Sequence, residues 1–413
     1  MRILWCTHTV IGYNSSKSGY NGCGWISSLL HQLEKRSDIE IGIAFYTDKL
    51  EKAKHENNIS FFPIYYKRAI TDKILGKLNI RRFLLKREKS NLNHLKQIIH
   101  SFKPDIIHVW GTETDMGLIS NEFCIPPVII HIQGLMAPYN NALLPPGFSK
   151  LDFIIKDGFT FHKIVNNYIS FNYWKYKAER ESRIMKHTKY YFGRTDWDKA
   201  ISSLYSPNSQ YFFCSEVLRE SFKLEYSWKN NDKSMCKIIS TISPPLYKGM
   251  DLILKTAQVL KKNTKIDFVW NVIGLNSCGY IEKKLHIKAS EVNVYTIGIK
   301  GANELKELLE TSSIYFHPSY IDNSPNSVCE AQVIGIPIIA VNVGGVSSLF
   351  PKDCINNLIP ANDPYYAASC IKKLFLKSNI DYTISNFAIQ RHTPANIIES
   401  IIKTYKKILI NDK

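Results

Sequence analysis

Short apolar segments alternate with amphipathic helical stretches along almost the whole chain, and this alternation limits the fold more than any other feature of the sequence. In the first half, strand-like runs such as IEIGIAFY at 39–46 and IIHVW at 106–110 are separated by stretches with helical spacing, such as 25–35. The other strands expected are 2–6, 128–134, 236–243, 267–274, 293–298, 313–318 and 336–341, and further helices are expected at 248–262, 302–310 and 394–410. The segment 189–205 is expected to form a strand, a turn and a helix. This alternation of strands and helices predicts parallel sheets covered by helices on both faces, in two doubly wound α/β domains.

The polar segment SWKNNDKSM at 227–235 separates the two series of elements and is the expected domain boundary. A chain of 413 residues has room for two or three domains of ordinary size. We expect an N-terminal domain at 1–225, a C-terminal domain at 226–390 and, at 391–413, a helix that packs back on the body. Ligands of open parallel sheets bind beyond the carboxyl ends of the strands, so residues that follow strands are the first candidates for a site.

The charge and the cysteines narrow the choice of partner and compartment. Basic residues outnumber acidic ones by enough to give a formal net charge of +17, which favours an anionic partner such as nucleic acid, an anionic membrane surface or a phosphorylated substrate. Nine cysteines are scattered singly, as is typical of free thiols in a reducing compartment. No apolar run approaches the roughly 18 residues of a membrane-spanning helix. We expect a cytoplasmic protein that can lie peripherally on the inner face of the membrane.

Two acidic residues with seven residues between them stand in the segment SYIDNSPNSVCEAQVIGIPIIAVNVGG, residues 319–345. Asp322 lies in a polar loop after a strand, and Glu330 lies in a helix that otherwise reads as core. Ser324 is a candidate N-cap, with Pro325 at the first helical position. Because the amide groups at a helix N-terminus favour phosphate or carboxylate ligands, acids beside such an end can hold the hydroxyl groups of a sugar and a ribose, with phosphates between them.

These residues resemble glycosyltransferase family 4, which consists of retaining enzymes with the GT-B fold, two facing Rossmann-like domains with an interdomain cleft. Asp322-x7-Glu330 matches the E-x7-E element of the family and is followed, as in the family, by Ala, a Gly-x-Pro strand entry and a Gly-Gly turn. Lys248, followed by Gly249, matches the basic residue at the first helix of the C-terminal domain. The sequence departs from the family in two places: the first acid is Asp, and the arginine often found five residues before the lysine is Ser243.

The resemblance implies a role for each matching residue. Lys248 would stabilise the charge that grows on the diphosphate leaving group, Asp322 would hold the donor sugar, and Glu330 would accept hydrogen bonds from the ribose, so these three are the catalytic candidates. No metal ion or other cofactor is expected, since the lysine and the helix amides do the work of a cation. Further expected contacts of the nucleotide sugar are Gly22 and Gly24 of the Gly-rich loop GYNGCGW, Arg194, Gly274, Gly298, Ile299, Asn323, Ser324, Asn326 and Ser327.

Two features of the N-terminal half have competing explanations. His131 and Gln133 end the run IIHIQG, where the family often has a polar residue near the donor sugar, but His131 can equally be a core histidine. The segment TDWD at 195–198 has the D-x-D spacing of a metal site in the other major glycosyltransferase fold. We interpret it instead as a helix start, because Thr195 and Asp198 have the spacing of a capping box.

The stretch 67–103 holds eleven Lys and Arg residues against two acids, with apolar residues such as Phe83, Leu84 and Leu85 between them. As an amphipathic helix or pair of helices it can lie on anionic lipid, at about 1 kcal/mol for each basic residue near the surface. The alternative is a solvated face of an ordinarily packed helix. Nucleic acid is not expected as a partner, because the sequence shows no recognised nucleic-acid-binding motif.

Together these features predict a retaining glycosyltransferase of family 4 type. It would move a sugar from a nucleotide-diphosphate donor to a growing polysaccharide or lipid-linked oligosaccharide in bacterial surface-glycan biosynthesis. One alternative is a non-catalytic basic module that binds anionic glycan or nucleic acid. Another is a nucleotide-sugar epimerase on the same fold, which would need further acid and base groups that the sequence does not offer convincingly.

Overall fold

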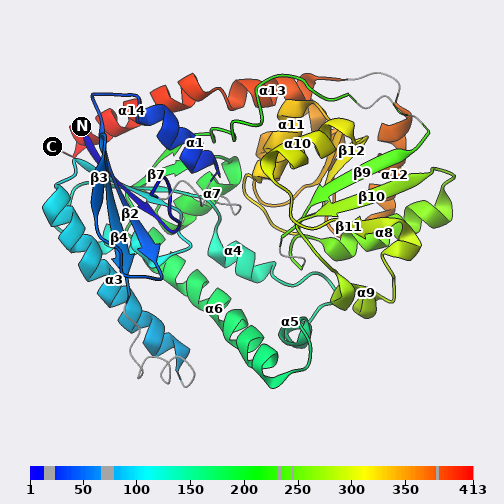
Figure 1. Cartoon of the computed structure of the whole chain (residues 1–413), viewed down its shortest axis with the longest axis horizontal. Coiled ribbons are helices and arrows are strands. Elements are labelled where there is room, and N and C mark those ends of the chain that lie inside the picture. Colours follow the sequence, from blue (N-terminus) through cyan, green and yellow to red (C-terminus); the bar gives the residue numbers. More distant parts are fainter. Residues whose placement is uncertain are drawn as a thin grey trace. The chain divides into compact units, whose positions relative to one another are not determined.

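The computed structural model describes residues 1–13, 24–66, 79–229, 232, 234–243, 246–377 and 381–412. These residues form two compact units, each with its own sheet and core (Figure 1). The first unit comprises Met1–Asn140, Ile169–Val217 and Pro394–Lys413, and the second comprises Asn141–Tyr168 and Leu218–Thr393.

The sheet of the first unit has the strand order β3-β4-β2-β1-β5-β6-β7-β8 within the described residues. Neighbouring strands pair in parallel except β3 and β4, which pair antiparallel. The strands are β1 (Arg2–Thr7), β2 (Glu40–Thr47), β3 (Lys54–Glu56), β4 (Ile59–Tyr65), β5 (Ile106–Trp110), β6 (Val128–His131), β7 (Tyr190–Gly193) and β8 (Gln210–Phe213). After β1 the chain first adds β2, β3 and β4 on one side of this strand and then returns to add β5 to β8 on its other side. The topological switch point of the sheet therefore lies between β1 and β5.

Helices cover both faces of this sheet. On β1, Ile3 and Trp5 belong to one core cluster and Leu4 and Cys6 to another, so alternate residues of a single strand are buried on opposite faces. The helices are α1 (Gly24–Leu33), α3 (Ile80–Phe102), η1 (Asp115–Asn121), α4 (Met136–Asn141), α7 (Asp196–Tyr205) and α14 (Pro394–Asn411), and α6 (Phe161–Met185) has residues in both units. The C-terminal helix α14 places Tyr405 in the same cluster as Ile3 and Trp5.

The second unit has a sheet with the order β11-β10-β9-β12-β13-β14, in which every described pair of neighbours is parallel. The strands are β9 (Cys236–Thr241), β10 (Phe268–Ile273), β11 (Val294–Thr296), β12 (Ile314–His317), β13 (Ile338–Val341) and β14 (Leu358–Ile359). The chain builds outward from β9 to β11, then returns to place β12 on the other side of β9. The switch point of this sheet therefore lies between β9 and β12.

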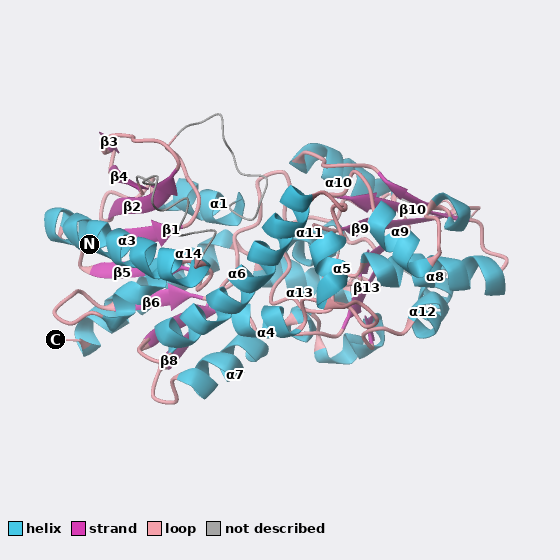
Figure 2. Ribbon diagram, turned by 90° about the horizontal axis from the view of Figure 1, so that it is seen from below, coloured by secondary structure: helices cyan, strands magenta, loops and turns pink. Residues whose placement is uncertain are grey.

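Helices also cover both faces of the second sheet (Figures 1 and 2). Leu309 of α10 and Val328 of α11 pack with Ile239 and Tyr315 in one core cluster. The helices are α5 (Lys150–Ile155), α8 (Met250–Asn263), α9 (Gly279–Leu285), η2 (Ser290–Val292), α10 (Ala302–Thr311), α11 (Asn326–Ile334), η3 (Val346–Leu349), η4 (Lys352–Asn357), α12 (Pro364–Leu376) and α13 (Thr383–Arg391). The predicted alternation of strands and helices around two parallel sheets is confirmed.

The strands that the sequence did not predict are short, exposed or interrupted. β4 contains Pro63, which argues against a strand by sequence alone, and β8 is half exposed. The long helix α6 was not predicted either, since polar and aromatic residues occur all around it.

Candidate active site

The loops after β9 and β12 meet in backbone contact at the switch point of the second sheet. The Tyr320 amide donates to the Tyr247 carbonyl oxygen at 2.8 Å. Gly249 has a φ of +80°, and a Cβ atom added there would lie 2.1 Å from the carbonyl oxygen of Pro318. Only glycine leaves room for the two backbones to come this close, so Gly249 allows the loop after β9 to pack against the loop after β12.

Lys248 and Asp322, which come from these two loops, form an ion pair. The Lys248 ammonium lies 2.5 Å from Oδ2 of Asp322, and their side chains are 18% and 7% exposed. The same oxygen accepts from the Ser319 hydroxyl at 3.2 Å and lies 3.2 Å from Nε2 of His317. The structure thus brings two predicted catalytic candidates together and adds His317, which the sequence analysis missed.

Burial and pairing oppose each other in setting the charges of this pair. Burial acts to raise the pKa of Asp322, but Lys248 and His317 outweigh it and hold that pKa below its usual value. Burial acts to lower the pKa of Lys248, and the Asp322 carboxylate outweighs it in turn. Burial is the main cause that lowers the pKa of His317. At neutral pH the pair is therefore ionic, beside a neutral imidazole.

The Gly-Gly turn after β13 closes on the backbone of Asp322. The Gly345 amide donates to the Asp322 carbonyl oxygen at 2.9 Å. Gly344 has a φ of +54°, and a Cβ atom added there would lie 2.0 Å from that same oxygen. The Gly-Gly turn that was noted in the sequence therefore has a structural role, because it holds the loop that carries Asp322.

Glu330 lies in the second turn of α11 and pairs with Arg219. Nε and Nη2 of Arg219 donate to the two carboxylate oxygens at 2.7 Å each. The side chain of Glu330 is 3% exposed, and that of Arg219 is 30% exposed. Arg219 stands 111 residues earlier in the chain, and no pattern around it in the sequence marks it as a partner.

Tyr315 is a fully buried residue of β12. Burial is the main cause that raises its pKa, and the hydroxyl groups of Ser327 and Thr241 act to lower it. The carboxylates of Glu330 and Asp322 act to raise this pKa. The two acids follow β12, one in the loop and one in α11, and each is paired with a cation of the second unit.

The glycines predicted to approach a nucleotide end the neighbouring strands. Gly274 follows β10 with a φ of +98°, and an added Cβ atom would lie 2.3 Å from the Ile242 carbonyl oxygen. Its amide donates to the carbonyl oxygen of Gly298 at 2.8 Å, and Gly298 has a φ of +72°. Ile299, the next residue, is 57% exposed. The structure places these three residues together; their contact with a nucleotide stays a prediction.

The start of α11 differs from the prediction by one residue. The helix begins at Asn326, and the residue before it is Pro325, whose ψ of 117° is extended. Ser324 is therefore not the N-cap; it is buried, with its hydroxyl 3.9 Å from the Cys329 sulfur. The other predicted loop residue, Asn323, is also buried.

Predicted residues of the first unit have mostly structural surroundings. Gly22 lies outside the described residues, and Gly24 is the first residue of α1. Arg194 is buried, donates to the Gln133 carbonyl oxygen at 2.8 Å and lies 3.5 Å from the Glu216 carboxylate. The Gln133 side chain accepts from the indole of Trp25 at 3.2 Å.

His131 is fully buried in a stack of rings. Its Nδ1 lies 3.2 Å from Nε2 of His108, and its ring stacks on Trp110 with the centroids 4.8 Å apart. Burial, then His108 and Arg194, lower the pKa of His131 well below its usual value. The structure thus gives His131 the surroundings of a neutral core histidine.

The TDWD segment caps a helix, as predicted. The Asp198 amide donates to the Thr195 hydroxyl at 3.1 Å, and the Asp198 carboxylate accepts from the Thr195 amide at 3.3 Å. No group of three or more His, Cys, Asp or Glu residues has a metal-binding arrangement in the part of the chain that the structure describes.

The basic stretch 67–103 is described only from residue 79 onward, where it forms α3. Phe83 and Leu84, predicted for a lipid-facing surface, are buried against Tyr176, and only Leu85 of the three is exposed, at 44%. That part of the prediction is wrong, because the apolar stripe of α3 packs on its own unit. No described helix is both long enough and apolar enough to span a membrane.

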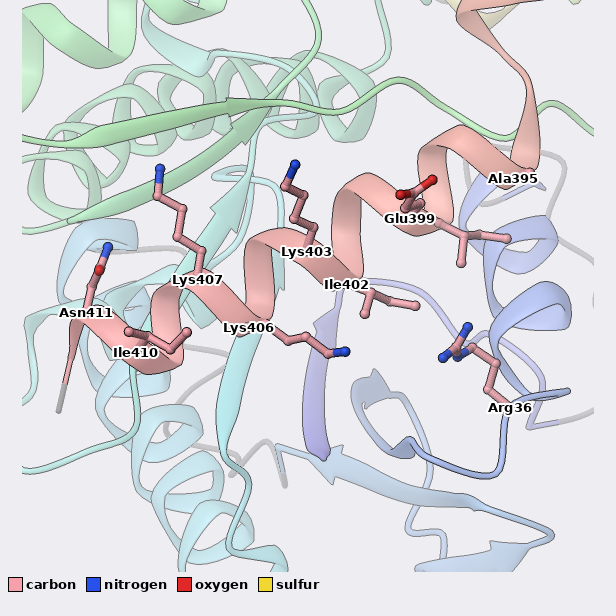
Figure 3. A pocket seen from close by; sticks show the side chains of 10 residues that line it. Arg36, Ala395, Glu399, Ile402, Lys403, Lys406, Lys407, Ile410 and Asn411 are labelled. Atoms are coloured by element: carbon pink, nitrogen blue, oxygen red, sulfur yellow. The ribbon is translucent and has the colours of Figure 1, made fainter.

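A groove of about 920 Å³ runs along α14 in the first unit (Figure 3). Its apolar residues are Ala395, Ile398, Ile402 and Ile410, and its charged residues are Arg36, Glu399, Lys403, Lys406 and Lys407. Lys403 and Lys407 extend from one side of the helix, and Lys406 extends toward Arg36 (Figure 3). None of the predicted site residues lines this groove.

Comparison with known proteins finds that part of this chain is similar to glycosyltransferases. Residues 226–391 match the family model described as "Glycosyl transferases group 1". An "Uncharacterized glycosyltransferase" of Haemophilus influenzae is 37% identical over 106 residues, which are 25% of this chain and 29% of that protein. The "Putative colanic acid biosynthesis glycosyltransferase WcaL" of Escherichia coli is 23% identical over 155 residues, 35% of this chain and 36% of that one. The chain thus spans about a third of the length of these curated relatives.

Solved structures match the whole chain at low sequence identity. Sucrose-phosphate synthase of Thermosynechococcus elongatus covers 99% of both chains with a TM-score of 0.66 at 12% identity. WaaG, a glycosyltransferase involved in lipopolysaccharide biosynthesis, covers 98% of this chain and 99% of its own with a TM-score of 0.59 at 11% identity. Anabaena Alr3699/HepE, solved in complex with UDP-glucose, covers 98% and 100% with a TM-score of 0.61 at 15% identity. The predicted GT-B fold class is confirmed.

Proposed function

We propose that this protein is a retaining glycosyltransferase of family 4 type that takes its sugar from a nucleotide-diphosphate donor. The observation that carries the proposal is the pair of buried acids that follow β12 at the switch point of the second sheet, each held by a partly exposed cation: Asp322 by Lys248 and Glu330 by Arg219. Ligands of open parallel sheets bind at such points. The match of this unit to a glycosyltransferase family model supports the assignment.

The charges of the site suit the chemistry of glycosyl transfer. Breaking the anomeric C–O bond builds negative charge on the nucleoside diphosphate, and a preformed cation is worth most where that charge develops. Lys248 is already ionic and held by Asp322, so a diphosphate can take the ammonium as its partner while Asp322 accepts from hydroxyl groups of the sugar. With retention at the anomeric carbon, the leaving phosphate would help to deprotonate the acceptor on the same face.

Glu330 can serve the ribose without leaving Arg219. Each of its oxygens accepts one bond from the guanidinium, and a carboxylate oxygen has room for a second donor. Arg219 would thus orient the carboxylate for the ribose hydroxyls. Since its side chain is 30% exposed, it also adds positive charge on a site whose sequence has Ser243 at a position where the family often has arginine.

We propose a polysaccharide or lipid-linked oligosaccharide as the acceptor, in bacterial surface-glycan biosynthesis. The relative named for colanic acid biosynthesis and the neighbour named for lipopolysaccharide biosynthesis support this setting. A peripheral place on an anionic membrane would fit such an acceptor. Exposed basic residues of α3, which include Arg81, Arg82, Lys86 and Lys89, support a membrane contact.

The test begins with thermal melting of the protein alone and with UDP, GDP, ADP and CDP in separate samples. A transferase is expected to melt at a higher temperature with one of these nucleotides, because a ligand of the folded state stabilises it by mass action. Equal melting with all four would favour the basic binding module over the transferase.

The second step uses nucleotide sugars with the base that the melting identifies. Release of the free nucleoside diphosphate with transfer to a glycan acceptor would support the proposal, and the anomeric proton coupling of the product would report retention or inversion. Conversion of the sugar with the nucleotide still attached would instead show the epimerase.

A further inference from the structure

Four large apolar side chains stand far out of the surface of the second unit, where α5 joins α6. Phe159 and Phe161 are 79% and 83% exposed, Leu151 is 63% exposed, and Tyr168 is 49% exposed. Leu151 belongs to α5, Phe161 is the first residue of α6, and Phe159 lies in the connection between these helices (Figures 1 and 2). Several exposed apolar side chains within one short segment usually mark a binding surface.

The opposite side of this segment is firmly anchored, so the exposed residues do not reflect a loose loop. Ser149 caps α5 through Asp152, and the Asp152 carboxylate also accepts from the Tyr280 hydroxyl at 2.6 Å. Lys284 of α9 lies 3.0 Å from the same carboxylate. Phe153 is buried one position after Asp152. The helix therefore presents Leu151 outward from a fixed base.

Three lysines of the same segment accompany the apolar residues. Lys150 is exposed, and its ammonium lies 4.9 Å from the centre of the Tyr168 ring. Lys163 is exposed two residues after Phe161. Lys156 pairs with Asp157 at 2.7 Å. Aromatic side chains next to lysines are typical of surfaces that lie at the level of lipid headgroups.

We propose that this segment, residues 150–163 together with Tyr168, inserts its apolar side chains into the leaflet of an anionic bilayer that faces the protein. Side chains that are about four-fifths exposed project from the surface and fit a fluid layer that closes around them. The lysines beside them complement anionic headgroups. The inference extends the proposed membrane contact and does not depend on the transfer reaction.

A second copy of the chain is a less favourable partner for this segment than a bilayer. A groove on the chain that could receive a phenylalanine is the one along α14, which has an apolar floor. That groove is edged by Lys403, Lys406 and Lys407 (Figure 3), which would meet the lysines of the inserted segment. Like charges in such a contact are unfavourable, so charge favours the bilayer.

The experiment is co-sedimentation of the full chain with vesicles of phosphatidylcholine alone and with vesicles of phosphatidylcholine that also contain phosphatidylglycerol as the anionic lipid. The protein is expected to bind the anionic vesicles. The double variant F159S/F161S is expected to bind them at least tenfold more weakly, since burying one phenylalanine is worth roughly one to two powers of ten. The matched control is Leu204→Ser on α7, which removes a side chain that is 75% exposed outside the segment.

Vesicle binding by the double variant equal to that of wild type would overturn the proposal, as would failure of the wild type to bind anionic vesicles. A wild-type dimer that F159S/F161S converts to monomer in sedimentation velocity, without vesicle binding, would assign the segment to a second copy and also overturn it. Nucleotide-dependent melting of the double variant separates the two proposals, because it should remain as in wild type whatever the vesicles show.

Discussion

The two sheets have the same order of parallel strands around their switch points, but the residues that follow these strands differ. In the second unit, the loops after β9 and β12 and the helix α11 carry members of two ion pairs, whose cations Lys248 and Arg219 keep 18% and 30% of their side chains exposed. In the first unit, the ends of β5 and β6 carry Trp110 and His131, which are stacked on each other and almost fully buried. Lys248, which would exchange Asp322 for a diphosphate, needs access to solvent, and so does Arg219 if it adds positive charge to the site, whereas stacked rings need none. We therefore expect donor chemistry to depend on the second set and stability on the first.

The largest effect is expected from Lys248→Ala. Removal of this cation would lower turnover by about 10²–10³-fold, since it would stabilise the charge on the leaving diphosphate. It would also leave the Asp322 carboxylate buried without its cation. Steady-state kinetics with the donor that the melting screen identifies measures the loss.

Lys255→Ala is the matched control for this variant. Lys255 also forms an ion pair at 2.8 Å, with Asp251 of the same helix, and its side chain is 25% exposed. It is expected to retain nearly full activity. Comparable losses in the two variants would contradict the special role of Lys248.

The next effect is expected from Glu330→Ala, with about a hundredfold lower kcat/KM and an intact fold. Arg219→Ala is expected to cost about tenfold through a higher KM, because Glu330 would keep its charge but lose its orientation. If Glu330→Ala retained near-normal activity, the ribose assignment would be wrong. A double variant no worse than Glu330→Ala would show that Arg219 acts through the carboxylate.

Gly344→Ala tests whether the Gly-Gly turn positions Asp322. The added Cβ atom would lie 2.0 Å from the Asp322 carbonyl oxygen, at a φ of +54°. We expect about tenfold lower activity and a loss of about 1–3 kcal/mol in the free energy of unfolding. Gly301→Ala is the control, since its nearest neighbour would lie 3.6 Å away and its φ is −66°. Kinetics and urea unfolding of both variants measure the difference.

The two regions also differ in how many of their site residues could be predicted from the sequence alone. Gly274, Gly298 and Asp322 at the second sheet edge were predictable because they follow strands, and parallel strands end at one edge. Lys248 and Glu330 were predictable from the resemblance to glycosyltransferase family 4. Arg219 was not, since the partner of Glu330 comes from 111 residues away and only the folded chain brings them together. His317 was not predictable either, because the sequence shows only that it lies in a strand and not that its Nε2 lies 3.2 Å from the Asp322 carboxylate.

The first unit was harder to predict for a related reason. A histidine at the end of a strand can face a ligand or the core, and the sequence left both open for His131. The rings that enclose it, among them Trp25 and His108, come from separate elements. The apolar residues of α3 likewise read as a lipid-facing stripe, although Phe83 and Leu84 pack on Tyr176 of the distant helix α6. In each case tertiary packing, which leaves no local pattern, decided the outcome.

The smallest effect on activity is expected from substitution of Glu181 in the first unit. This substitution should instead change how the free energy of unfolding depends on pH. This side chain is fully buried and accepts from the Thr112 hydroxyl at 2.5 Å and from the Met136 amide at 2.7 Å. Burial raises the pKa of Glu181 to about 7, although these hydrogen bonds act to lower it. The folded state therefore holds a proton that the unfolded state releases at lower pH. The resulting stabilisation is complete below about pH 4.5 and is lost as the pH rises through 7.

Urea unfolding of wild type and Glu181→Gln between pH 5 and 8 isolates this contribution, because other titrating groups cancel in the difference. Wild type should lose about 2–3 kcal/mol relative to the variant over that range. Glu179→Gln, which removes a carboxylate that is 39% exposed on the same helix, should keep the wild-type dependence. Nucleotide-induced melting shifts should be the same in all three proteins, because the ion pairs at β9 and β12 belong to the other unit. A nucleotide response that changed with Glu181 would show that the first sheet edge takes part in donor binding, and the contrast between the two edges would fail.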